Sequence, residues 1–153
     1  MFKTLKALFD DQVTQVESKQ SPFTALELAC AVLLIEVAMA DDNFSVVERE
    51  SISHILHHQF HITPALIAQL IDTAEQAYKD SIDHFQFTKH LSDHYDYDER
   101  LKFIAALWQL AYADHELDKM EEHRIRRFCD LLFIDHSDFI RLKLQTKQQL
   151  GIS

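Results

Sequence analysis

The stretch Ala38–Ile52, AMADDNFSVVERESI, nearly recurs as Ala111–Ile125, AYADHELDKMEEHRI, and this repeat decides how the chain folds. The matched pairs are Ala38 and Ala111, Ala40 and Ala113, Asp41 and Asp114, Glu48 and Glu121, and Ile52 and Ile125. The same offset also pairs the apolar residues Leu28 with Leu101, Leu34 with Leu107, and Phe44 with Leu117. Two copies of one helix–turn–helix unit, at 24–58 and 97–131, are therefore predicted, arranged about a pseudo-twofold.

Glycine and proline are nearly absent from the 153 residues, and this argues against a sheet protein. One glycine and two prolines occur, whereas the tight turns of sheets draw heavily on both. Hydrophobic residues make up 47%, which is too many for a disordered chain, and the length suits one domain with its own core. We predict an all-α fold, a single compact bundle of about seven to eight helices built from two pseudo-repeated hairpins.

Apolar periodicity and N-cap signals divide the chain into helices. The signals include Ser21 before Pro22, Thr63 before Pro64, and acidic residues three positions after Ser45, Asp96 and Asp118. The predicted helices cover about 1–18, 22–40, 45–58, 63–79, 82–91, 96–114, 118–132 and 135–148. The first is a separate N-terminal amphipathic helix, and 21–148 forms the helical domain, in which 63–92 bridges the two hairpins.

The N-terminal segment places apolar residues on one helical stripe, namely Phe2, Leu5, Phe9, Val13 and Val16. Lys3 and Lys6 beside that stripe would allow contact with a membrane surface or a partner. Because only two lysines are present and two aspartates follow them, packing against the protein's own domain is favoured.

The net charge of −10 disfavours nucleic acid and anionic lipid, because phosphate binding needs clusters of Lys and Arg. It favours cations or a basic protein surface, although composition does not identify a protein partner or an oligomeric state. Cys30 and Cys129 lie in apolar runs and indicate core thiols in a reducing compartment. No signal peptide is apparent, and the longest apolar run carries Glu27 and Glu36, so a cytoplasmic protein is expected.

The repeated acids, Asp41, Glu48, Asp114 and Glu121, are the candidate binding residues. Each Asp ends a predicted helix, where the helix dipole disfavours an acid by roughly 0.3–1 kcal/mol. Nearby backbone amides or a bound cation would neutralise these acids, and the sequence favours neither over the other. Four converging carboxylates would suit a divalent cation such as Ca²⁺, Mg²⁺ or Mn²⁺. Each Glu also has a structural role open to it, as the acidic member of a capping box.

The doubled pattern A-x-A-D-x-x-[FL]-x-x-x-E in an acidic, helical chain resembles the TerB-like tellurite-resistance family. It is also similar to the N-terminal domain of the membrane-anchored DnaJ-like co-chaperone, and the resemblance covers roughly 24–140. It implies a helical bundle with an acidic cluster that binds divalent cations, and a non-enzymatic module acting in tellurite, phage or envelope stress. The family usually has Gly directly after each Asp, whereas this chain has Asp42 and His115 there.

Two other functions stay open, a metal-dependent hydrolase and a metal-free helical scaffold. The sequence lacks the E-x-x-H pairs of di-iron bundles, an adjacent His-Asp pair, G-x-S-x-G and glycine-rich phosphate loops, so no catalytic residue is predicted. Asp42, Glu36 and His115 are possible additional metal ligands. Glu36 is expected to be a lone exposed position on a buried helix. The other histidines, which include His54, His57, His58, His61, His90 and His94, are expected to be solvated surface residues rather than a transition-metal site.

Overall fold

The computed structural model describes residues 22–41, 44–81, 83–114 and 117–152, and every regular element in those ranges is helical. In chain order the elements are α2 (Ala25–Ala38), the short 3-10 helix η1 (Met39–Asp41), α3 (Val46–Phe60), α4 (Pro64–Asp80), α5 (Phe85–His94), α6 (Tyr97–Ala111), α7 (Lys119–Leu131) and α8 (His136–Gln149). The predicted all-α bundle is thus confirmed for this part of the chain. The predicted helix 1–18 lies outside the described residues.

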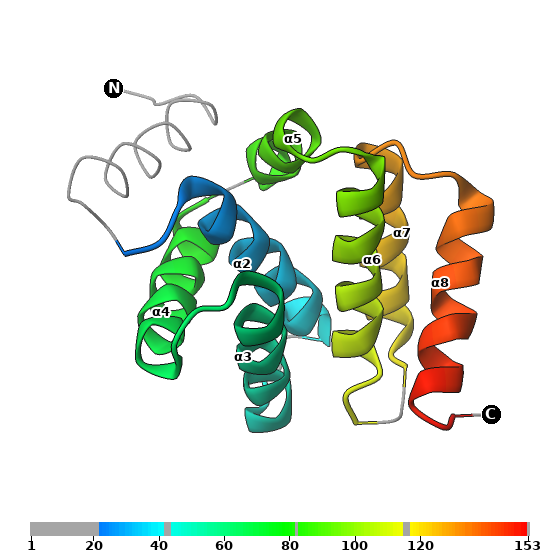
Figure 1. Ribbon diagram of the computed structural model, residues 1–153, viewed down its shortest axis with the longest axis horizontal. Helices are drawn as coiled ribbons and strands as arrows, with labels where there is room; N and C mark the ends of the chain where they lie inside the picture. Colours follow the sequence, from blue (N-terminus) through cyan, green and yellow to red (C-terminus); the bar gives the residue numbers. More distant parts are fainter. Residues whose placement is uncertain (1–21, 42–43, 82, 115–116, 153) are drawn as a thin grey trace.

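The central helix of the bundle is α2, which crosses it between α4 and α6 (Figure 1). Leu28, Val32 and Ile35 are fully buried, and the helix contacts α3, α4, α5, α6 and α7. A helix that is apolar on all sides is stable in water only when neighbours cover every side. None of the helices in the described ranges has the length and apolar character needed to cross a membrane.

The two predicted hairpins are the pairs α2–α3 and α6–α7, and the helices between them hold the pairs together. Helix α4 packs on α2 and α3, whereas α5 contacts α2 and α7. The last helix, α8, lies against α6 (Figure 1). The short helix η1 contacts α7, and this contact brings the end of the first hairpin's leading helix to the second hairpin.

The start of α2 differs from the prediction, which placed the N-cap at Ser21. The N-cap is Thr24, whose hydroxyl accepts a hydrogen bond from the Glu27 backbone N–H at 3.1 Å. The Glu27 carboxylate accepts in return from the Thr24 N–H at 2.7 Å. This reciprocal pair satisfies two backbone N–H donors at the start of the helix. The Ser-Pro pattern offers no such pair of hydrogen bonds, so the helix begins after Thr24. Ser21 itself lies outside the described residues.

Candidate carboxylate site

The first corner of the repeat is held by the predicted capping box at the start of α3. The Ser45 hydroxyl accepts from the Glu48 backbone N–H at 3.1 Å, and Glu48 Oε1 accepts from the Ser45 N–H at 3.0 Å. Glu48 is half-buried. The cap engages one oxygen of the Glu48 carboxylate, so the predicted structural role of this residue is present.

The second corner is capped differently from the first, although it shares the repeated Asp and Glu positions. The Asp118 carboxylate accepts from the Met120 backbone N–H at 2.7 Å, and no reciprocal box forms between Asp118 and Glu121. Glu121 is only 6% exposed, whereas Asp114 is exposed. The two glutamates therefore occupy matched sequence positions in different local surroundings.

A small cavity of about 90 Å³ lies where the two corners meet. Ser45 and Glu48 line it from the first hairpin, and Ala113, Asp114 and Glu121 line it from the second. Two small side chains also line it, Ala111 at the end of α6 and Ala113 just after that end. Three of the four predicted carboxylates are thus placed around one cavity, and they come from both copies of the repeat.

The remaining predicted ligands cannot be placed in the same way. Asp41 is the last residue of η1, but its side chain is outside the described part of the chain, as are Asp42 and His115. Among the described residues, no three His, Cys, Asp or Glu side chains are grouped as a set that could hold a metal ion. Glu48, Asp114 and Glu121 line the same cavity, but as the described residues stand they do not form such a set.

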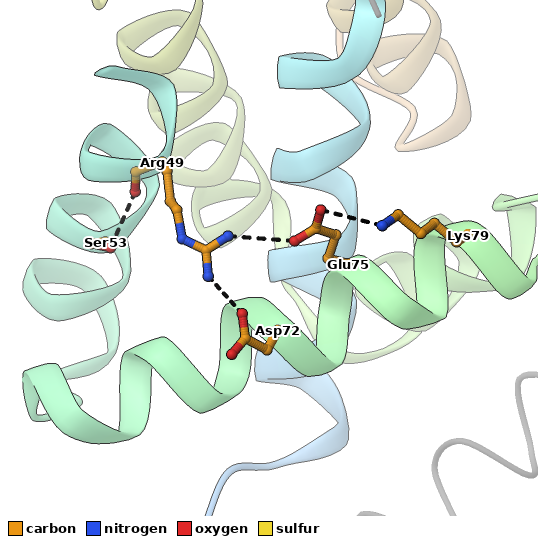
Figure 2. A network of polar contacts seen from close by, with 5 residues as sticks. All are labelled: Arg49, Ser53, Asp72, Glu75 and Lys79. Carbon is orange, nitrogen blue, oxygen red and sulfur yellow. Dashed lines mark hydrogen bonds and ion pairs between the residues drawn. The ribbon is translucent and has the colours of Figure 1, made fainter. Parts of the chain in front are cut away.

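The start of α3, and with it Glu48, is oriented by ion pairs to α4 (Figure 2). The Arg49 guanidinium donates to Asp72 Oδ1 at 2.6 Å and to Glu75 Oε1 at 3.4 Å. Arg49 also lies over the Phe44 ring, 5.9 Å from its centroid. Because these side chains are partly exposed, the pairs add little to stability, and they link α3 to α4 beside the capping box.

Glu36 is not exposed, and the sequence-based prediction for it was wrong. Its side chain is buried, and Glu36 Oε1 lies 2.7 Å from His84 Nδ1. His84 Nε2 lies 3.2 Å from the Tyr78 carbonyl oxygen, and the Arg124 guanidinium donates to the Glu36 carbonyl oxygen. Glu36 therefore faces the loop between α4 and α5, and it does not line the carboxylate cavity.

The electrostatics of this pair favour a charged histidine. Both His84 nitrogens face oxygen acceptors, so the doubly protonated ring satisfies both contacts. Burial lowers the pKa of His84, but the hydrogen bond and the negative charge of Glu36 outweigh burial, and the net pKa is raised above 6.5. Sequence reasoning missed His84 because it lies 48 residues from Glu36, and no local pattern links them.

The other predicted surface histidines on α3 are indeed exposed, including His54 and His58. The rings of His54 and His58 lie with centroids 4.1 Å apart, as do those of His90 and His94 on α5. The two histidines of each pair are one helical turn apart. Among the described residues, no third potential metal ligand joins either pair.

Comparison with known protein families agrees with the helical fold. A family model described as "Tellurite resistance protein TerB" matches residues 27–144, which is most of the chain. The matched span runs from the first turn of α2 into α8 and includes both acidic corners. Searches of curated proteins and of solved structures each found no match.

Proposed function

The chain belongs to the TerB family of tellurite-resistance proteins, and from this premise we propose that it is a non-catalytic stress-response module whose carboxylate cavity binds one divalent cation. The observation that carries the proposal is the meeting of Glu48 with Asp114 and Glu121 around a space of about 90 Å³. The stress would be of the tellurite or envelope type. Asp41, at the end of η1, is the fourth ligand that we propose.

The chemistry of the cavity indicates which ions it would take. Carboxylate oxygens are hard ligands, which favours Mg²⁺, Ca²⁺ or Mn²⁺ over softer metals. Because the described residues supply no group of three ligands, the ion that we propose would need Asp41 and several of its own waters to complete its coordination, as Mg²⁺ commonly keeps several waters. The ion would neutralise acids contributed by both hairpins and so join the two corners. A basic protein surface is the partner that we propose, since the net charge is −10.

Thermal unfolding of the full chain with and without each cation tests the proposal. A cation that binds only the folded state, at a concentration of 100 times its Kd, adds about 2.7 kcal/mol to the free energy of unfolding. For a chain of this size, the midpoint would rise by roughly 5–10 °C. Glu121→Gln and Asp114→Asn should abolish the rise. The matched control is Asp130→Asn, which removes an exposed carboxylate near the other end of α7.

Two outcomes would overturn the proposal. If millimolar Mg²⁺, Ca²⁺ and Mn²⁺ leave the unfolding midpoint unchanged, the chain is a metal-free scaffold. If the shift persists in both Glu121→Gln and Asp114→Asn, the ion binds elsewhere. Hydrolysis of a generic phosphoester that is lost in Asp41→Asn would contradict the non-catalytic part and favour a metal-dependent hydrolase.

A further inference from the structure

A continuous groove runs between α3 and α6. Its lining is more apolar than that of the carboxylate cavity. Three hollows of about 320, 440 and 450 Å³ adjoin along it. Gln59 and Lys102 line both the first and the second hollow, and His54, Ile55 and Gln109 line both the second and the third. In Figure 1 these two helices stand next to each other, with α4 on the other side of α3.

The groove exists because the facing side chains are too small to fill the space between the helices. Its floor includes Ile55 and Ala106, which are 5% and 6% exposed, and α6 contributes the small residue Ala105 as well. At the end near the C-terminus, Val47 and Leu150 remain 48% and 39% exposed. An apolar floor with polar rims is the kind of surface that receives one face of an amphipathic helix.

We propose that this groove is the docking site for residues 2–16 of the same chain, bound as an amphipathic helix. That segment carries the apolar stripe Phe2, Leu5, Phe9, Val13 and Val16. As a helix it would be about 21 Å long from Phe2 to Val16, and the part of α3 that lines the groove, from Val47 to Phe60, is about 20 Å long. The stripe and the groove therefore match in length.

The segment can lie in the groove in two directions, and its covalent link to α2 selects one of them. Leu26, on the first turn of α2, lines the end of the groove formed with Phe60 and Tyr95. The five residues 17–21 can span up to about 17 Å, so Val16 would lie at this end and Phe2 at the other.

This direction also makes the charges complementary. Lys3 and Lys6 would lie at the end that carries Glu50, and Asp10 and Asp11 would lie near Lys102 in the middle. The opposite direction would bring the lysines to the end that carries both Glu99 and Lys102 and would leave Glu50 without a basic neighbour from the segment. The charges are thus compatible with the direction that the linker length imposes, and the linker length remains the main reason for that direction.

Disulfide trapping in the full chain tests the docking. The pair Gln12→Cys with His58→Cys places one thiol beside the stripe and the other on the groove rim. The matched control, Gln12→Cys with Gln69→Cys, uses an exposed position on α4 outside the groove. Native Cys30 and Cys129 are buried and stay unreactive in both. We expect the groove pair to oxidise within one chain at least about tenfold faster than the control, independently of protein concentration.

The same experiment separates the alternative occupants. Phe9→Asp, added to the groove pair, should reduce its rate to that of the control, because a charge in the stripe cannot enter an apolar floor. Equal rates for the two pairs would overturn the proposal. Covalent dimers that form in place of internal disulfides would show that the segment of a second copy fills the groove, which would also overturn it.

Discussion

Replacing Glu36 with Gln should destabilise the fold strongly for so small a change. The carboxylate and the His84 ring are 12% and 13% exposed, and Glu36 Oε2 is buried without a hydrogen-bond partner. The amide still accepts from His84 through one oxygen, but a charge-assisted bond becomes a neutral one, at a cost of about 1–2 kcal/mol. The new NH₂ group takes the place of Oε2 and adds an unsatisfied donor, which costs about 1 kcal/mol more. We expect a loss of about 2–3 kcal/mol in the free energy of unfolding.

The pH dependence of this loss follows from the raised pKa of His84. A group that holds its proton more tightly in the folded state stabilises that state while the proton is bound. The contribution of the pair is therefore complete below the unfolded value of 6.5 and declines as pH rises through the folded pKa. At a pH above the folded pKa, the His84 ring is neutral and donates only one hydrogen bond. Its other nitrogen then turns a lone pair toward either the Glu36 carboxylate or the Tyr78 carbonyl oxygen.

Urea unfolding followed by far-UV circular dichroism, for the wild type and Glu36→Gln across the range from about pH 6 to pH 9, measures both effects. The difference between the two proteins should be largest near pH 6 and should shrink as pH rises. Glu75→Gln is the control, since that carboxylate is 29% exposed in surface ion pairs and its loss should cost under about 1 kcal/mol. A loss at pH 6 no larger than the control's, or one that stays constant to pH 9, would refute the reasoning.

Three further outcomes are expected. In the same urea assay, Ser45→Ala should lower the free energy of unfolding by about 1 kcal/mol, because it removes a capping box; Thr63→Ala should change it by only a few tenths, since the Thr63 side chain makes no cap hydrogen bond. Burial raises the pKa of both Cys30 and Cys129 to about 12, so a thiol reagent at neutral pH should label them only after unfolding in urea, and rapid labelling of the native protein would contradict this. Trp108→Phe should cost about 1–2 kcal/mol, less than truncation to Ala, because the buried indole N–H that it removes has no hydrogen-bond partner.

The helical architecture could be predicted from the sequence because its signals are local. Capping at Ser45 and Glu48, and at Asp96 and Glu99, depends on residues three positions apart, and both capping boxes are present. The apolar residues on all sides of α2 likewise predict a buried helix without knowledge of its neighbours, and the structure buries it. The repeat then predicts which helices pair as hairpins.

The parts that sequence reasoning missed depend on contacts between distant residues. Glu36 looks like a surface position when α2 is considered alone, because its partner His84 comes from a loop 48 residues away. The two corners share a sequence pattern, yet Asp118 caps at Met120 and Ser45 caps at Glu48. The N-cap residue itself differs between the corners, and which backbone N–H its side chain reaches also depends on how the chain enters the helix.

The cavity between the corners has a consequence for the history of the chain. Its walls come from both hairpins, so neither half could form it alone. A half-length ancestor with one hairpin would have needed to associate with a second copy, and the acids would then have met on the symmetry axis of that homodimer. Duplication and fusion would convert such a shared site into an internal one. After fusion, each glutamate would be free to acquire its own surroundings, and in the present chain Glu48 is half-buried whereas Glu121 is buried.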